Sequence, residues 1–192
     1  MAKIKGSKTE KNLLKAFAGE SQARNRYTYF ASVAKKEGLE QMAAFFLETA
    51  DNEKEHAKRF FKFLDSGDAL EITAMYPAGK FGTTTENLKA SAAGENEEWT
   101  KLYPGFANIA QEEGFTEVAT IFRMISKVEK EHEARYLKLL ENLKKNEVFK
   151  KAKPTRWKCR NCGYIHEGDT APQMCPACQH PQAHFEVAEI NY

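Results

Sequence analysis

The sequence predicts an all-α four-helix bundle with one long crossover, followed by a small C-terminal domain that is held together by metal. Residues from about Thr9 to Asn146 are rich in Ala, Leu, Lys and Glu, with apolar residues every three or four positions. This helical pattern has one long interruption near its middle, and all four cysteines fall after it, between Cys159 and Cys178. We therefore expect a helical domain at residues 1–146, a basic connector at 147–156 and a cysteine-containing domain at 157–192.

Breaks at Gly38, at residues 66–85 and at Gly114 divide the helical domain into four helices, expected at residues 9–36, 40–65, 85–112 and 116–145. The first and last breaks are short, so the helices on either side of each should form antiparallel hairpins. The central link, SGDALEITAMYPAGKFGTTT, has about twenty residues and can run back along a whole helix. It would also permit hairpins to exchange between subunits, without indicating that they do.

The two hairpins repeat each other. AGE at 18–20 recurs at 93–95, an offset of 75, whereas VAKKEGLEQMAAFF at 33–46 matches IAQEEGFTEVATIF at 109–122, an offset of 76. One extra residue therefore lies between Glu95 and Tyr103. Because a single inserted residue is commonly absorbed as one π-helical turn, we predict a helical irregularity there.

Each helix carries ionisable residues at mid-length on its apolar stripe. The tetrapeptide EKEH occurs at 53–56 and again at 129–132, and its first and last residues are in phase with the stripe. Glu55 and Glu131 are about 200° from the preceding Glu and should face water. In the third helix Glu98 is in phase, although Glu97 competes with it and Leu102 is expected on the buried stripe. The inward-facing set is Glu20, Glu53, His56, Glu95, Glu98, Glu129 and His132.

Buried charges on all four helices are difficult to explain without bound cations. One Glu from each of two helices and Glu-x-x-His from each of the other two is the ligand pattern of di-iron and di-manganese carboxylate bundles. Four carboxylates balance two divalent ions. Oxidation of both ions would leave a charge of +2, which would favour an oxo or hydroxo bridge and one more anion, and Glu98 is positioned to supply that anion. Tyr27 and Tyr103, on the same stripes, could donate hydrogen bonds to ligand carboxylates.

The C-terminal domain has the spacing of a four-thiolate metal site. CRNC and CPAC place Cys159, Cys162, Cys175 and Cys178 as two Cys-x2-Cys pairs separated by twelve residues. This spacing alone slightly favours zinc, but a redox-active pair of metals needs a route for electrons, which zinc cannot provide. We therefore favour iron and interpret His166, His180 and His184 as surface or packing residues.

Composition and charge bear on the binding partners and the cellular compartment of the protein. A net charge of +2 with no basic stripe gives no reason to expect nucleic acid or membrane binding, and no run approaches the ~20 apolar residues of a membrane span. The first twelve residues lack the apolar segment of a secretion signal. Because the thiols are confined to one cluster, a reducing compartment is favoured, and we expect the protein in the cytoplasm.

Taken together, these motifs closely resemble the rubrerythrin family over nearly the whole chain. The resemblance rests on Glu20, Glu53-x-x-His56, Glu95-x-x-Glu98 and Glu129-x-x-His132, then Cys-x2-Cys-Gly-Tyr and Cys-Pro-x-Cys, with no ligand position missing. It implies a ferritin-like four-helix domain with two non-haem iron ions, followed by a rubredoxin-like domain with one iron bound by four cysteines.

The resemblance also implies an activity. The family suggests an iron peroxidase that reduces hydrogen peroxide to water in the oxidative-stress response, with electrons from a reductase or rubredoxin and ultimately from NAD(P)H. It implies that one iron exchanges His56 for Glu98 on oxidation, and we count Glu98, His56, Tyr27 and Tyr103 as catalytic. It further implies a head-to-tail homodimer in which one subunit's rubredoxin-like domain serves the other's di-iron site.

Three alternatives use the same residues. An iron-storage protein would share the bundle ligands but would form a large hollow shell, which sizing of the native protein would detect. A zinc-binding module with the bundle as a scaffold would be colourless. A hydroxylase that activates O2 would need a substrate pocket, which the sequence does not reveal.

Overall fold

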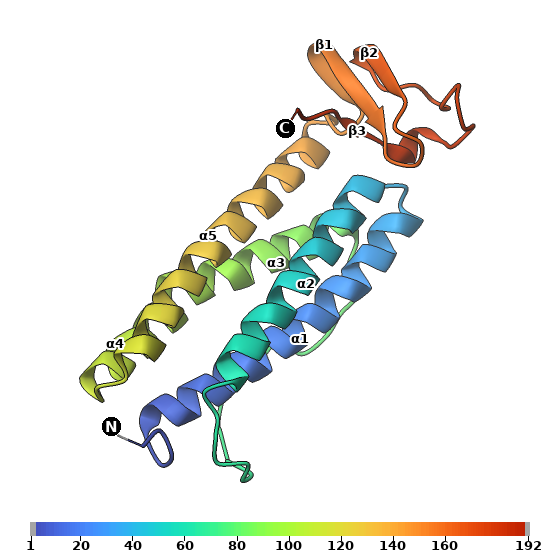
Figure 1. Cartoon of the computed structure of the whole chain (residues 1–192). Helices are drawn as coiled ribbons and strands as arrows, with labels where there is room; N and C mark the ends of the chain where they lie inside the picture. The colour runs from blue at the N-terminus through green and yellow to red at the C-terminus, as the bar shows by residue number, and fades with distance from the viewer. Residues whose placement is uncertain (1–2, 191–192) are drawn as a thin grey trace.

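The computed structural model describes residues 3–190 and contains a helical bundle with a small β domain at one end (Figure 1). The first hairpin pairs α1 (Lys8–Lys36) with α2 (Glu40–Phe61). In the second, α5 (Thr116–Lys144) packs along α3 (Thr84–Glu97), η1 (Glu98–Leu102) and α4 (Tyr103–Glu112). Residues 62–83 form the long crossover without regular helix or strand, so the predicted architecture is confirmed.

The helix ends follow from local sequence. Thr83 begins α3 with a capping box, in which its side chain accepts from the Glu86 N–H and the Glu86 side chain accepts from the Thr83 N–H. Gly38 and Gly114, with φ of 74° and 84°, end α1 and α4 in the left-handed conformation that glycine adopts without strain. The second predicted helix ends at Phe61 rather than 65, because the next turn tightens into hydrogen bonds from Phe63 to Phe60 and from Leu64 to Phe61.

The internal repeat also appears in contacts between the hairpins. Glu113, at the end of α4, accepts hydrogen bonds from the N–H groups of Lys8 and Thr9 at the start of α1. Glu37, at the end of α1, accepts from the Thr84 N–H at the start of α3. Each hairpin therefore supplies a carboxylate to the exposed N–H groups that begin the other.

The predicted irregularity in the third helix is confirmed: η1 is a π-helical turn that separates α3 from α4. The extra residue changes which side chains face inward. Leu102, which we expected on the buried stripe, is 39% exposed, whereas the neighbouring Tyr103 is buried. A uniform period of 3.6 residues misplaces Leu102 because a π turn holds more residues than an α turn.

The small domain is a three-stranded antiparallel sheet in the order β2-β1-β3, formed by β1 (Lys150–Cys159), β2 (Ile165–Thr170) and β3 (Phe185–Val187). Because Lys150 already pairs with Thr170, most of the expected connector belongs to β1 and the connector is correspondingly shorter. Trp157 fills the small core and donates through Nε1 to the Gly168 carbonyl at 2.9 Å.

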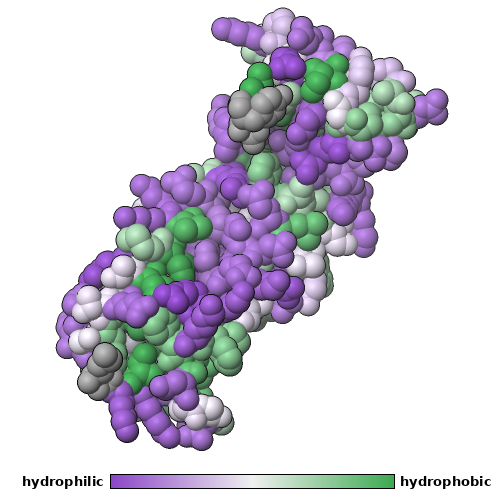
Figure 2. Space-filling view, viewed as in Figure 1, coloured by the Kyte–Doolittle hydropathy of each residue, from purple (hydrophilic) through white to green (hydrophobic). Residues whose placement is uncertain are grey.

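The bundle has two apolar clusters rather than one continuous core. One contains Phe30, Phe46 and Tyr136, and the other contains Leu13, Phe60 and Phe122. The face seen in Figure 2 is mostly hydrophilic, with hydrophobic patches on the lower half of the bundle and on the small domain. Among residues 3–190, none of the helices combines the length and apolar composition needed to cross a bilayer.

Candidate metal centres

A layer of ionisable side chains separates the two apolar clusters at the middle of the bundle. Glu20 comes from α1, Glu53 and His56 from α2, Glu95 from α3, and Glu129 and His132 from α5. The four carboxylates and His132 are at most 2% exposed. The repeated motifs thus place six of the seven predicted ligands in one layer, while Glu55 and Glu131 face solvent as expected.

These six residues form two overlapping groups. Glu20, Glu53, His56 and Glu129 can each offer one ligand atom within 4.8 Å of the others, and so can Glu53, Glu95, Glu129 and His132. Glu53 and Glu129 belong to both groups. Two cations held by these groups would share Glu53 and Glu129, and each would also have one Glu and one His of its own.

The histidines present Nδ1 to the centre of this layer. His56 Nδ1 lies 2.9 Å from Glu53 Oε2 and 3.0 Å from Glu129 Oε1, and His132 Nδ1 lies 2.8 Å from Glu129 Oε2. On the far side of its ring, His132 Nε2 is 3.2 Å from Asn52 Oδ1. Since Asn52 Oδ1 can only accept, Nε2 donates to it, and Nδ1, which faces the carboxylates, would be the nitrogen that binds a metal.

Several buried polar atoms of this layer lack hydrogen-bond partners among the described residues. They are Glu20 Oε2, Glu53 Oε1, Glu95 Oε2, both oxygens of Glu129 and His132 Nδ1. Leaving so many polar atoms unsatisfied in a protein core is costly. Because they converge on the two groups above, the residues fit a pair of bound cations that would satisfy them together.

The pKa values show how strongly the layer favours positive charge. Burial, then Glu53 and Glu129, raise the pKa of Glu20 well above its ordinary value, and burial and Glu53 raise that of Glu95 to about 8. Burial lowers the pKa of His56, but the adjacent Glu129 and Glu53 carboxylates outweigh it and raise the value to about 9. Protons would thus offset the clustered negative charge where cations do not.

Two buried tyrosines hold the terminal carboxylates across the hairpins. The Tyr27 hydroxyl on α1 donates to Glu95 Oε1 at 2.5 Å, and the Tyr103 hydroxyl donates to Glu20 Oε1. Tyr27 lies seven residues after Glu20, whereas Tyr103 lies eight after Glu95. The π turn absorbs the extra residue, so both tyrosines occupy equivalent places.

Glu98, the seventh predicted ligand, lies outside both four-residue groups. It is the first residue of η1 and is half-buried, whereas Glu97 is exposed, so Glu98 is the residue directed toward the layer. The corresponding position in the first hairpin is Ala23, at an offset of 75. The second hairpin therefore has a carboxyl group where the first has a methyl group.

A clamp on η1 was not evident from the sequence. Glu133 on α5 accepts from Trp99 Nε1 at 2.5 Å and from Asn96 Nδ2 at 3.0 Å, and Ser126 Oγ donates to the Trp99 carbonyl at 3.2 Å. These contacts hold the backbone on both sides of Glu98 against α5. The sequence signal was faint: Glu133 follows the second EKEH, where the first is followed by Ala57.

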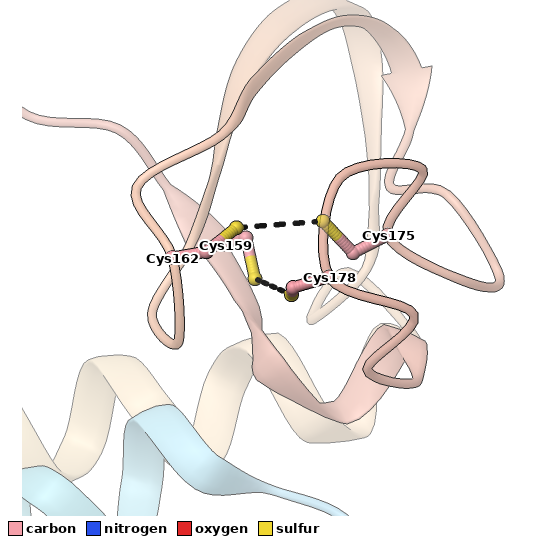
Figure 3. Close-up of side chains that lie close together, drawn as sticks. All are labelled: Cys159, Cys162, Cys175 and Cys178. Atoms are coloured by element: carbon pink, nitrogen blue, oxygen red, sulfur yellow. Dashed lines mark hydrogen bonds between the residues drawn. The ribbon is translucent and has the colours of Figure 1, made fainter.

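The four cysteines of the small domain converge on one point (Figure 3). The Sγ atoms of Cys159 and Cys178 are 3.7 Å apart, as are those of Cys162 and Cys175. A tetrahedral site with metal–sulfur bonds near 2.3 Å would have sulfur–sulfur edges of about 3.8 Å. The cysteines are therefore spaced for a single four-coordinate ion, and none is joined in a disulfide.

The two Cys-x2-Cys loops have the same backbone shape. The N–H groups of Gly163 and Gln179 donate to the carbonyls of Cys159 and Cys175, each at 2.8 Å. Both donors have left-handed φ, of 80° for Gly163 and 58° for Gln179. The next N–H in the second loop, that of His180, is the largest contribution lowering the pKa of the Cys178 thiol to about 6, which favours the thiolate that binds metal.

Comparison with known families agrees with this two-part organisation. The Rubrerythrin family model matches residues 11–140, and the model for the rubredoxin-like domain of rubrerythrin matches residues 157–186. Rubrerythrin of Porphyromonas gingivalis is 65% identical over 189 residues, covering 98% of this chain and 94% of that protein. Rubrerythrin of Nitratidesulfovibrio vulgaris is 57% identical over 192 residues, covering all of both chains.

Solved structures show the same fold. Nigerythrin in its fully reduced, all-ferrous state aligns over 96% of this chain and 91% of its own, with a TM-score of 0.64 and 30% identity. A bacterioferritin from Desulfovibrio desulfuricans aligns over 73% of this chain and 82% of its own, with a TM-score of 0.64 and 22% identity, which bears on the fold alone. The bundle is ferritin-like, the small domain is rubredoxin-like, and their side chains fit a di-iron site and an Fe(Cys)4 site.

Proposed function

Because the chain belongs to the rubrerythrin family, we propose that it is a non-haem iron peroxidase that reduces hydrogen peroxide to water and defends the cell against oxidative stress. The balanced reaction joins one hydrogen peroxide, two electrons and two protons to give two waters. Iron held by Glu20, Glu53, His56, Glu95, Glu129 and His132 would supply both electrons at one place. The chain's own residues then have to bind peroxide and deliver protons.

The observation that carries this proposal is the extra carboxyl group of Glu98. It lies beside the six ligands without belonging to either group of four, and it is half-buried, whereas all of the ligands except His56 are buried. Burial, then Glu95 and Glu129, raise the pKa of Glu98 well above its ordinary value. A protonated carboxyl in this position can give its proton to the oxygen that leaves as water.

Deprotonated, Glu98 has a second use. Going from two divalent to two trivalent ions adds a charge of +2, which four carboxylates no longer balance. Glu98 would then serve as a further anionic ligand in place of His56, the neutral terminal ligand whose side chain is 13% exposed.

Tyr27 and Tyr103 would orient the terminal carboxylates, Glu95 and Glu20, in both the reduced and the oxidised site. Burial, followed by the nearby Glu95 or Glu20, raises the pKa of each phenol well above its ordinary value, so each stays protonated and continues to donate. A ligand held by such a bond keeps one orientation when the charge of the site changes.

Electrons would enter through the four-cysteine site, supplied by a reductase or rubredoxin and ultimately by NAD(P)H. The small domain lies beyond the α1–α2 turn, where Ala183 faces Gly38 (Figure 1). From Glu40 to Glu53, α2 alone spans about 20 Å. This separation within one chain supports a head-to-tail homodimer in which the cysteine site of one subunit serves the di-iron site of its partner. We assign the protein to the cytoplasm, whose reducing conditions keep the thiols available for metal.

Mixed dimers test both parts of the proposal. A chain carrying Cys159→Ser keeps its di-iron ligands, and a chain carrying Glu129→Gln keeps its cysteines. With a donor reductase, each homodimer should fail to turn over peroxide, whereas the heterodimer should recover about half of the normal activity. An inactive heterodimer in which the Cys159→Ser chain still reacts once with peroxide after chemical reduction would exclude delivery between subunits.

A further inference from the structure

The AGE motif contains a glycine that the ligand pattern does not explain. Gly19 and Gly94 each precede a terminal ligand, and both lie inside long helices, in α1 and α3. Neither has the left-handed φ that would require glycine, and glycine is among the least favourable residues in a helix interior. A glycine retained at both places therefore indicates a need for space beside the ligands.

That space is a cavity of about 390 Å³ between α1, η1 and the crossover. Gly19 and Gly94 both line it. A Cβ added to Gly94 would meet no atom within 4 Å, and one added to Gly19 would meet only Tyr76 Cε1, at 3.7 Å. A larger side chain at Gly94 would therefore project into open space, and one at Gly19 would project toward the Tyr76 ring.

The inner end of the cavity reaches the chemistry of the site. Glu98 and Tyr103 form part of its wall, whereas the six ligand side chains do not. Two other cavities, of about 640 and 350 Å³, touch neither Glu98 nor any of the six ligands. Of the six ligands, His56 is the most exposed, with 13% of its side chain accessible, so its side of the layer is the alternative route.

The crossover covers the outer end. Tyr76 lies over Gly19, and its hydroxyl donates to the Lys15 carbonyl on α1 at 2.8 Å. Met75 beside it is 97% exposed. Among the described residues, this hydrogen bond is the one that ties segment 73–77, part of a loop without helix or strand, to α1. A side chain on Gly19 would contact the Tyr76 ring.

We propose that this cavity is the entrance through which the oxidant reaches Glu98 and the metal pair, and that Gly19, Gly94 and Tyr76 set the size of the molecule that enters. The proposal rests on the proposed peroxidase function for the identity of the oxidant. The wall is mixed: Ala16, Met75 and Phe106 are apolar, whereas Gln22, Arg26 and Glu97 are polar. A small uncharged molecule can pass such a wall, and Glu98 and Tyr103 are the wall residues that adjoin the metal layer.

Gly94→Leu tests the entrance, with Gly105→Leu as its matched control. Gly105 is also helical, in α4, and an added Cβ there meets nothing within 4 Å, but it does not line the cavity. Both changes should raise the melting temperature because leucine favours helix. With full iron content and an unchanged absorption spectrum, Gly94→Leu should slow reoxidation by hydrogen peroxide about tenfold or more, Gly94→Ala should slow it less, and Gly105→Leu should not.

A gain of reactivity complements this loss. Tyr76→Ala opens the outer end, so reoxidation by tert-butyl hydroperoxide should accelerate relative to that by hydrogen peroxide. If the ratio of the rate with tert-butyl hydroperoxide to the rate with hydrogen peroxide is the same in Tyr76→Ala as in the unchanged protein, Tyr76 does not limit the size of the oxidant. If Gly94→Leu reacts with hydrogen peroxide as fast as the unchanged protein, the cavity is not the entrance, and entry beside His56 is favoured.

Xenon provides a readout that does not depend on activity. Because apolar cavities bind xenon, crystals of the full protein under xenon pressure should show it between Gly94 and Tyr76, and Gly94→Leu crystals should not. Xenon beside His56 instead would refute the proposal. If the unchanged protein fails to react with peroxide, the proposed function fails, and xenon occupancy together with reoxidation by O2 still decides where small molecules enter.

Discussion

The hydrogen bonds from Tyr27 and Tyr103 to the terminal ligands can be tested against a third buried tyrosine of the bundle. Tyr136 is fully buried and lies 5.5 Å from Tyr27 between ring centroids, but its hydroxyl has no hydrogen-bond partner among the described residues. Replacing each tyrosine by phenylalanine removes one oxygen from a comparable environment. Tyr136→Phe is therefore a matched control for Tyr27→Phe and Tyr103→Phe.

The expected magnitude follows from what each carboxylate would lose. Glu20 Oε2 and Glu95 Oε2 have no partner, so the tyrosine is the only hydrogen-bond donor that either carboxylate has among the described residues. A hydrogen bond to a charged group contributes about 1.5–3 kcal/mol, and loss of such support to a ligand typically weakens metal binding by about 10–100-fold. Tyr136→Phe should change stability by less than about 0.5 kcal/mol, because no bond is lost.

Two assays measure the effect. Competition with a chelator under anaerobic conditions gives the affinity for ferrous iron, and thermal unfolding of the loaded protein should show a fall of about 4–8 °C for a loss of about 2 kcal/mol. Equal losses for all three variants, or unchanged affinity in Tyr27→Phe and Tyr103→Phe, would show that these bonds do not support the ligands.

Three further predictions concern single positions. Glu98→Gln should retain full iron and slow reoxidation by peroxide by about a hundredfold, whereas the exposed Glu97→Gln should not; equal rates in the two variants would remove Glu98 from the mechanism. Glu113→Gln should lower the free energy of unfolding in urea at neutral pH by about 1 kcal/mol, because it weakens the hydrogen bonds to the first N–H groups of α1. The control Glu112→Gln should leave the free energy of unfolding unchanged. Burial raises the pKa of Glu113, but hydrogen bonds from Thr9 and Lys8 at the start of α1 outweigh burial and lower it. The stability that Glu113 contributes is therefore fully present above the pKa of a Glu in the unfolded chain, and it should be lost as the pH falls through the lower pKa of the folded protein. A loss of stability in Glu113→Gln that does not depend on pH would contradict this. Gln179→Gly should slow metal release from the cysteine site, because a left-handed non-glycine residue costs about 1 kcal/mol, and faster release would count against that explanation.

Much of the bundle could be predicted because its functional residues repeat. Apolar periodicity and the breaks at Gly38, 66–85 and Gly114 predict four helices in two hairpins. The change of offset from 75 at AGE to 76 at EKEH predicts the π turn inside the third helix. The periodicity argument works for Glu53 and Glu129 because they lie in uninterrupted helices. It fails for Leu102, which is the last residue of the π turn and faces outward.

Contacts that depend on the packing of one helix against another could not be predicted in this way. Asn52 meets His132 across two helices, and Trp99 meets Glu133 only because η1 rotates it toward α5. Neither pair has a repeated partner in the sequence to mark it. The connector was overestimated for a similar reason, since Lys150 becomes a strand residue only by pairing with Thr170.

The central claim, that this protein reduces peroxide with electrons passed from its cysteine site, is tested most directly by stopped-flow reoxidation. One anaerobically reduced sample would be mixed with hydrogen peroxide and, separately, with O2, while absorbance from the di-iron and Fe(Cys)4 sites is followed. We expect peroxide to reoxidise the protein faster than O2, with the cysteine site oxidised only after the di-iron site. Faster reaction with O2, or a cysteine site that stays reduced while further peroxide is consumed, would contradict the claim.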